Sequence, residues 1–254
     1  MKSRPGSSTK RKAGKSRGAK RQGGAKPASA KARIAPDEIT QAKSVPPIVG
    51  IGASAGGLEA FTQLLRALPQ DTGMAFVLVQ HLDASHESML VKLLSGVTQM
   101  AVAEVKHGMQ AQPNHMYVIP PNADIIMVNG ALQLIRREAP AGRHMPIDHF
   151  FRSLAQDQGA RAIGVVLSGT AADGTLGLKA IKAEGGITFA QEPDSAKYDG
   201  MPRSAISASC VDFVLPPDRI ATELLRISRH PYVELASQEE GPPLRPRESS
   251  DFCV

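Results

Sequence analysis

A serine surrounded by small residues stands between a predicted strand and a predicted helix. The segment Gly52-Ala53-Ser54-Ala55-Gly56 fits the pattern G-x-S-x-G of a nucleophile elbow. Small neighbours permit the sharp turn that exposes such a serine, because bulky side chains on either side would clash. The N-terminus of the helix that follows would stabilise negative charge developing beside the hydroxyl. The spacing therefore predicts that Ser54 is a nucleophile.

A histidine and an aspartate follow two other predicted strands. His81 comes after the apolar run 75–79, and Asp173 after the run 162–167. In a serine hydrolase the histidine is the general base, and the aspartate orients the imidazole and stabilises its charged form. The alternatives are a structural role for His81 and, for Asp173, a turn before Gly174 or a cap of the next helix. The chain order Ser, His, Asp differs from that of the α/β-hydrolases.

The same glycines admit a second interpretation. Gly50, Gly52 and Ala55 form a degenerate G-x-G-x-x-G/A dinucleotide fingerprint. That motif needs an acidic residue at the end of the second strand to bind a ribose hydroxyl, and Gln80 and His81 occupy that place. The sequence therefore favours hydrolysis over dinucleotide binding, and we expect no cofactor.

Metal chemistry is also disfavoured. The histidine pairs 81/86 and 144/149 are each five residues apart, whereas a zinc-binding helix uses the i, i+4 spacing. The chain has two cysteines, too few for a four-cysteine zinc site or a disulfide scaffold. We expect no metal.

Strand and helix patterns alternate between residues 47 and 232. A continuously apolar run suits a strand of a parallel sheet, which is covered on both faces, and a repeat of three to four residues suits a helix. The alternation predicts one α/β domain, a doubly wound, mostly parallel sheet with helices on both faces. Expected strands are 48–52, 75–79, 116–119, 125–128, 162–167 and 187–190; expected helices are 58–68, 89–94, 149–156, 176–183 and 220–227.

Charge and composition together divide the chain into a basic N-terminal tail, a central domain and a C-terminal tail. Of its 254 residues, 1–46 hold 13 Lys and Arg against two acidic residues, a net charge of +11, and the remainder carries −5. We expect residues 1–46 and 233–254 to be disordered tails, because neither has enough large apolar side chains to form a core. The basic tail is either solvated or contacts an anionic partner: nucleic acid, lipid or acidic protein. No apolar run is long enough to span a membrane, so we expect a cytoplasmic protein with no transmembrane segment.

Several segments, taken in order, resemble the catalytic domain of the chemotaxis protein-glutamate methylesterases, the CheB family. The resemblance extends over nearly all of residues 47–232 and is carried by these segments: Ile51-Gly-Ala-Ser-Ala-Gly-Gly57, Val79-Gln-His-Leu82, Tyr117-Val-Ile-Pro-Pro-Asn122, Met145-Pro-Ile-Asp148, Val166-Leu-Ser-Gly-Thr-Ala-Ala-Asp-Gly174, Phe189-Ala-Gln191 and Gly200-Met-Pro-Arg203.

The resemblance implies a serine esterase that hydrolyses glutamate γ-methyl esters on methyl-accepting chemotaxis receptors, releasing methanol. It also implies deamidation of receptor glutamines. By motif, Ser54 is the nucleophile, His81 the base and Asp173 the orienting acid, and backbone N–H groups of Ala55 and Thr170 hold the oxyanion. Where the family usually has an N-terminal receiver domain the chain has its basic tail, so we expect no phosphorylation control by that route.

Three residues depart from the family pattern. Ala55 stands where many members have Thr, and Thr170 and Ala171 where many have Met and Gly. Ala171 matters most, because a Cβ disfavours the positive φ that a glycine there would permit. The alternative to an esterase is therefore a non-catalytic module of the same fold that binds receptors or signalling partners.

Overall fold

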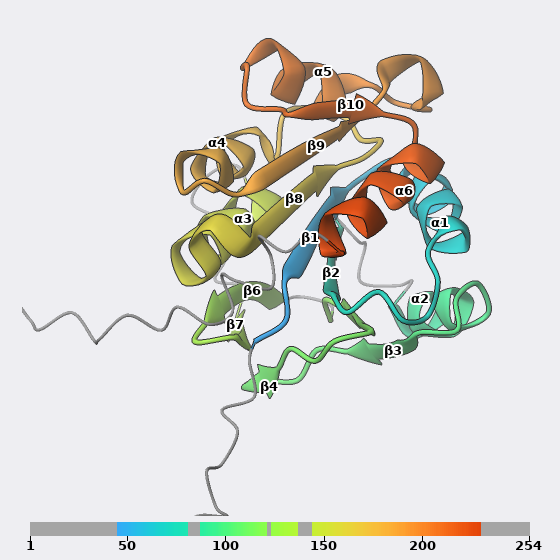
Figure 1. The fold of residues 1–254 in the computed structure, drawn as a ribbon, viewed down its shortest axis with the longest axis vertical. Coiled ribbons are helices and arrows are strands. Elements are labelled where there is room, and N and C mark those ends of the chain that lie inside the picture. Colours follow the sequence, from blue (N-terminus) through green and yellow to red (C-terminus); the bar gives the residue numbers. More distant parts are fainter. Residues whose placement is uncertain (1–44, 81–86, 121–122, 137–143, 230–254) are drawn as a thin grey trace, which may run out of the picture. The chain divides into compact units, whose positions relative to one another are not determined.

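Seven parallel strands form the central sheet of the protein (Figure 1). The computed structural model describes residues 45–80, 87–120, 123–136 and 144–229. The strand order is β10-β9-β8-β1-β2-β5-β3, and every neighbouring pair is parallel. The strands are β1 (Ile48–Ala53), β2 (Ala75–Gln80), β3 (Ala101–Glu104), β5 (His115–Val118), β8 (Ala162–Val166), β9 (Ile187–Gln191) and β10 (Phe213–Leu215).

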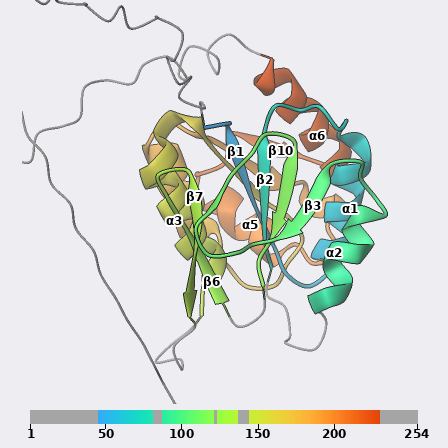
Figure 2. The ribbon, with the colours of Figure 1, turned by 90° about the horizontal axis from the view of Figure 1, so that it is seen from below.

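Helices cover both faces of this sheet, as the alternation predicts. The helices are α1 (Gly57–Ala67), α2 (Glu87–Ser95), α3 (Pro146–Gln158), α4 (Thr175–Ala183), α5 (Gly200–Ser207) and α6 (Pro217–Ser228). One buried cluster contains apolar side chains of α1, α2 and α6, and a second contains those of α3, α4 and α5. Figure 2 shows α1, α2 and α6 on one side of the sheet and α3 on the other. The predicted doubly wound α/β class is confirmed.

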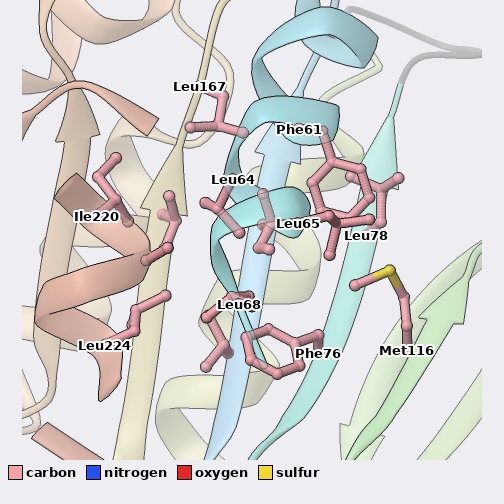
Figure 3. Packing of buried hydrophobic residues seen from close by; sticks show 14 of the residues in the cluster. Phe61, Leu64, Leu65, Leu68, Phe76, Leu78, Met116, Leu167, Ile220 and Leu224 are labelled. Atoms are coloured by element: carbon pink, nitrogen blue, oxygen red, sulfur yellow. The ribbon is translucent and has the colours of Figure 1, made fainter. Parts of the chain in front are cut away.

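Helix α1 shows how the sequence pattern becomes packing. Phe61, Leu64 and Leu65 recur at helical spacing and are each at most 1% exposed. They face β2 and the neighbouring strands, and Ile220 and Leu224 of α6 complete the cluster (Figure 3). Burying each such side chain contributes about 1.5–3 kcal/mol. The helix that carries this stripe begins at Gly57, so the same packing fixes where the chain turns after Ser54.

The glycines of β1 make room for helix α3. A Cβ on Gly50 would lie 2.8 Å from Cε1 of Phe151, and one on Gly52 would lie 2.3 Å from Cγ2 of Ile147. Both contacts are closer than side-chain carbons tolerate, so α3 packs directly on the strand backbone. The glycine spacing that suggested a dinucleotide fingerprint therefore serves helix packing.

The segment between β2 and α3 departs from strand–helix alternation. After α2 its described residues form strands but no helix, and three of these strands, β4 (Met109–Gln110), β6 (Ala123–Val128) and β7 (Ala131–Arg136), make a separate antiparallel sheet. Asn129 and Gly130 join β6 to β7 with φ of 52° and 70°, the two positive values of a type I′ hairpin turn. Asp157 of α3 accepts hydrogen bonds from both of their backbone N–H groups, which ties the hairpin to α3.

The chain order places a topological switch between β1 and β8. From β1 the chain winds through β2 towards β5 and β3, whereas from β8 it winds the other way through β9 to β10. Ligands of open α/β sheets bind beyond the carboxyl ends of the strands beside such a switch point. Ser54 follows β1 directly, and Asp173 lies in the loop after β8.

The predicted tails lie largely outside the described residues. Residues 1–44 and 230–254 are not described, so the tail boundaries at 46 and 233 remain predictions. Within the described ranges, no helix has the length and hydrophobicity needed to cross a bilayer.

Candidate active site

Ser54 opens a tight turn between β1 and α1. The N–H of Gly57 donates to the carbonyl of Ser54 at 2.9 Å, which closes a four-residue turn. Gly56, the third residue, has φ 70° and ψ −3°, the conformation that a type II turn requires at this position and that glycine adopts without strain. Ser54 is half-buried and Ala55 is exposed, so the turn presents its first residues at the protein surface.

The loop after β8 lies against this turn. The N–H of Ser54 donates to the carbonyl of Ser168 at 3.0 Å. The next residue, Gly169, admits no side chain, because a Cβ there would lie 2.9 Å from Cβ of Ser54 and 2.1 Å from Sδ of Met201. The backbone of the loop that carries Asp173 therefore touches the predicted nucleophile.

Asp173 is a buried carboxylate at 2% exposure, held by backbone donors. Its Oδ1 accepts from the N–H groups of Asp148 and Gly174, both at 2.9 Å, and its Oδ2 accepts from that of Ile147 at 3.1 Å. Ile147 and Asp148 lie in the first turn of α3, whose capping residue makes no side-chain hydrogen bond. Asp173 thus caps helix α3, a different helix from the one that follows it, and the partial positive charge of that terminus stabilises the carboxylate.

A second carboxylate lies behind Asp173. Asp148 is 4% exposed; its Oδ1 accepts from the N–H of Gly177 at 2.7 Å, and its Oδ2 is buried with no hydrogen-bond partner among the described residues. Burial raises the pKa of Asp148, and the negative charge of Asp173 raises this pKa further. The charged form of Asp148 is therefore disfavoured in the interior next to the candidate site.

The two predicted oxyanion donors are Ala55 and Thr170. Both residues are exposed, and within the described residues neither backbone N–H has an acceptor. They stand on the two loops that flank the switch point. N–H groups at such a place are the kind of donor that an oxyanion requires.

Ala171 has the unusual backbone conformation that the sequence suggested. Its φ is 71°, a region that residues with a Cβ rarely adopt. Gly200 packs closely on the same loop, since a Cβ there would lie 3.2 Å from the nitrogen of Ala171. The loop is therefore held in place from the side of α5, with the strain borne by Ala171.

His81, the predicted base, lies outside the described residues, as does His86. The register of the sheet nevertheless bears on His81, because it is the next residue after Gln80. Gln80 pairs with Ala53 across the β1–β2 ladder, and Ala53 is the residue before Ser54. The predicted base and the predicted nucleophile are thus the next residues in the sequence after a matched pair of strand ends.

A cavity of about 340 Å³ adjoins the serine turn. Its lining runs from Gly56 and the exposed side of α1 to the segment around η2 (Pro193–Ser195), and includes Glu59, Gln63, Asp194 and Lys197. These side chains are polar or charged. The cavity therefore suits a hydrated, polar segment of a protein better than an apolar small molecule.

Three residues at this edge were not given a role by sequence reasoning: Ser168, Gln191 and Tyr198. All three join the loops around Ser54 through hydrogen bonds. Ser168 directly follows the predicted strand 162–167, and Gln191 directly follows the predicted strand 187–190. Both residues lie in the segments that carry the resemblance. Polar residues at the carboxyl end of a buried strand are the signal that would have identified them.

Comparison with known proteins defines the class first. The solved structure of the Thermotoga maritima CheB methylesterase catalytic domain matches with a TM-score of 0.66 and 26% sequence identity, covering 72% of this chain and 98% of that chain. The fold is therefore that of a known type of doubly wound α/β domain.

Sequence comparison then gives the family. A family model described as CheB methylesterase matches residues 49–224, and the chain belongs to this family. It is 36% identical over 200 residues to protein-glutamate methylesterase/protein-glutamine glutaminase 2 of Burkholderia lata, covering 78% of this chain and 59% of the relative. It is also 36% identical over 202 residues to protein-glutamate methylesterase/protein-glutamine glutaminase 4 of Burkholderia thailandensis, covering 79% of this chain and 58% of the relative. The chain thus spans less than two thirds of these relatives' length.

Proposed function

We propose that the protein is a serine esterase that hydrolyses glutamate γ-methyl esters on methyl-accepting chemotaxis receptors and releases methanol. The observation that carries the proposal is the approach of two loops at the β1–β8 switch point, one bearing Ser54 and the other Asp173, in a chain of this family. The names of the relatives, which include protein-glutamine glutaminase, support deamidation of receptor glutamines as a second reaction of the same site.

The reaction proceeds through an acyl-enzyme. His81 takes the proton of the Ser54 hydroxyl while Oγ attacks the ester carbonyl carbon, and the N–H groups of Ala55 and Thr170 stabilise the oxyanion. The carbonyl reforms as the bond to the methoxy oxygen breaks, and the proton from His81 makes the leaving group methanol. Water then attacks the acyl carbon with His81 again as base, which releases Ser54 and a glutamate carboxylate. With a glutamine substrate the leaving group is ammonia.

Asp173 supports this sequence by stabilising the imidazolium that forms twice in each turnover. Three backbone donors hold its carboxylate in one orientation. No cofactor enters any step. The polar cavity beside Gly56 suits the receptor segment that flanks the esterified side chain.

The experiment is methanol release from a methylated chemoreceptor cytoplasmic fragment, with Ser54→Ala as the paired variant. We expect release by the wild-type protein and a loss of about 10³-fold or more in the variant. A folded wild-type protein that binds the receptor from its own source without releasing methanol would show a non-catalytic binding module instead. In that case the strained Ala171 in the Asp173 loop would be the first residue to examine.

A further inference from the structure

A buried hydroxyl outside the proposed triad contacts the nucleophile turn. Ser168 is 0% exposed and follows β8. Its Oγ donates to the carbonyl oxygen of Ala55 at 3.0 Å and accepts from the N–H of Tyr198 at 3.0 Å. The carbonyl of Tyr198 lies farther away, at 3.3 Å. Because a hydroxyl has one proton, the shorter contact makes Ala55 the preferred acceptor.

The carbonyl that Ser168 holds belongs to the central peptide of the turn. Type I and type II turns differ mainly in the orientation of this peptide, which carries the carbonyl of the second residue and the N–H of the third. In the turn that starts at Ser54, these groups are the Ala55 carbonyl and the Gly56 N–H. A flip of this peptide would move the Ala55 carbonyl away from Ser168. The hydrogen bond from Ser168 therefore selects the type II form, with Gly56 at φ 70°.

Ser168 is itself fixed from two sides. Its N–H donates to Oε1 of Gln191 at 2.8 Å, and Nε2 of this buried amide donates to the carbonyl of Ser195 at 2.9 Å. The Oγ also lies close beneath the turn, since a Cβ on Gly56 would be 2.8 Å from it. The Ser168 hydroxyl therefore cannot move with the Ala55 carbonyl if the turn changes shape, and their hydrogen bond would be lost.

We propose that Ser168 is a positioning residue, which holds the Ala55–Gly56 peptide and thereby fixes the type II shape of the turn that carries the Ser54 hydroxyl and the Ala55 N–H. This inference rests on the proposed esterase function. Its effect falls on the reacting geometry rather than on receptor binding, because Ser168 is buried and contacts only other parts of the protein.

The test compares Ser168→Ala with Ser153→Ala, a matched control. The hydroxyl of Ser153 also accepts from a backbone N–H, that of Met127, and donates to a backbone carbonyl, that of Phe150, but it lies on α3 outside the serine turn. We expect Ser168→Ala to lower kcat for methanol release about 10- to 100-fold, with less than about a twofold change in KM. Ser153→Ala is expected to keep the wild-type kcat while losing a similar amount of thermal stability.

A third variant tests the route through the turn. Gly56→Ala disfavours the positive φ directly, and its Cβ presses on Oγ of Ser168. If both residues act on one peptide, the loss of kcat in the double variant is smaller than the product of the two single losses. If Ser168→Ala proves hard to purify, Ser168→Cys replaces it in the same cycle. The cysteine side chain has a similar volume, and its thiol is a weaker hydrogen-bond donor than the hydroxyl.

Three results would overturn the inference: a wild-type kcat in Ser168→Ala, an equal loss in Ser153→Ala, or losses that multiply in the double variant. Failure of the proposed function looks different, because the wild-type protein would then release no methanol. The two failures are therefore distinguished by the wild-type measurement alone.

Discussion

Ala171 adopts a conformation that its own side chain opposes. An alanine at φ 71° is less stable than a glycine there by about 1 kcal/mol, because its Cβ crowds the carbonyl oxygen that follows. We expect Ala171→Gly to raise the free energy of unfolding by roughly that amount and to leave kcat for methanol release unchanged, because the backbone that carries Asp173 keeps its shape. Urea denaturation and the methanol assay measure both. Ala180→Gly, within helix α4, is the control and should destabilise by about 1 kcal/mol. A loss of stability in Ala171→Gly would contradict the observed φ.

Asp148 gives the protein a predictable dependence on pH. Burial first, and then the charge of Asp173, raises the pKa of this carboxyl above its ordinary 3.8. A raised pKa in the folded state means that the contribution of Asp148 to stability is fully present below that ordinary value. It is then lost as pH rises through the folded-state pKa. Asp148→Asn removes this titration, so the stability of the variant relative to wild type should increase from acid towards neutral pH. Urea denaturation at several pH values measures the difference.

Asp212 provides a control of opposite sign. Burial alone would raise its pKa, but hydrogen bonds from Lys182 and Thr188 outweigh burial and lower it. Its contribution is therefore present above its ordinary pKa and is lost as pH falls through the lower folded-state value. Asp212→Asn should accordingly lose most stability at neutral pH. If the Asp148→Asn difference is constant over pH, or moves in the same direction as that of Asp212→Asn, the account of Asp148 is wrong.

Helix α3 connects the packing of the sheet to the site. It lies on the glycines of β1, and its first turn donates the N–H groups of Ile147 and Asp148 to Asp173. A shift of this helix therefore moves the donors that hold the carboxylate. Gly52, the second glycine of β1, packs against Ile147, whose N–H donates to Asp173.

Gly52→Ala tests this connection. Its new Cβ would lie 2.3 Å from Cγ2 of Ile147, so we expect a loss of about 1–3 kcal/mol in the free energy of unfolding and a fall in kcat as α3 moves. In the double variant with Ile147→Ala, we expect losses smaller than the sum of the single losses, because this change removes Cγ2, the carbon that lies nearest the new Cβ. Urea denaturation and methanol release of the four proteins form the cycle. Strictly additive losses would show that the two residues do not oppose each other.

Elements with a strong period were predictable, and those fixed by long-range pairing were not. The stripe of α1 and the apolar runs of β1, β2, β8 and β9 identified the sheet class. Helix α5 and strand β10 were missed: the helix has eight residues with only a few buried, and the strand has three, too short for a period to show. Strand β6 was predicted in part, as 125–128, but β7 and the hairpin between them were missed, although Asn129-Gly130 is a turn signal in the sequence itself.

At the candidate site, the approach of the loops that carry Ser54 and Asp173 was predictable, because each loop follows a strand of one parallel sheet. The place of Ser168 directly after a predicted strand marks it as a candidate, but the groups that its hydroxyl contacts could not be predicted from the sequence. Its role depends on Ala55 and Tyr198, which are 113 and 30 residues away along the chain. Only the fold brings those backbone groups to it.

The whole molecule combines a described α/β domain with a strongly basic segment before it. The family match spans residues 49–224, and the matching solved structure is that of a catalytic domain alone, of which this chain covers 98%. The groups proposed for catalysis all fall within this span. Hydrolysis should therefore not need the basic residues 1–43.

Deleting residues 1–43 tests that separation of roles. The deletion removes all 13 basic residues of the first 46, together with two acidic ones, so the net charge of the chain changes from +6 to −5. We expect the kcat for methanol release to be unchanged, while retention on an anionic matrix such as heparin, which we expect of the full chain, is lost. Retention of the full chain should fall steeply with salt, because the contacts are electrostatic and release counterions. A full-length protein that elutes at the same salt as the shortened one would mean that the tail is only solvated. A shortened protein that is folded but inactive would show that the basic segment takes part in catalysis or receptor binding. The deletion removes none of the residues assigned to the reaction, so their loss could not explain such a result.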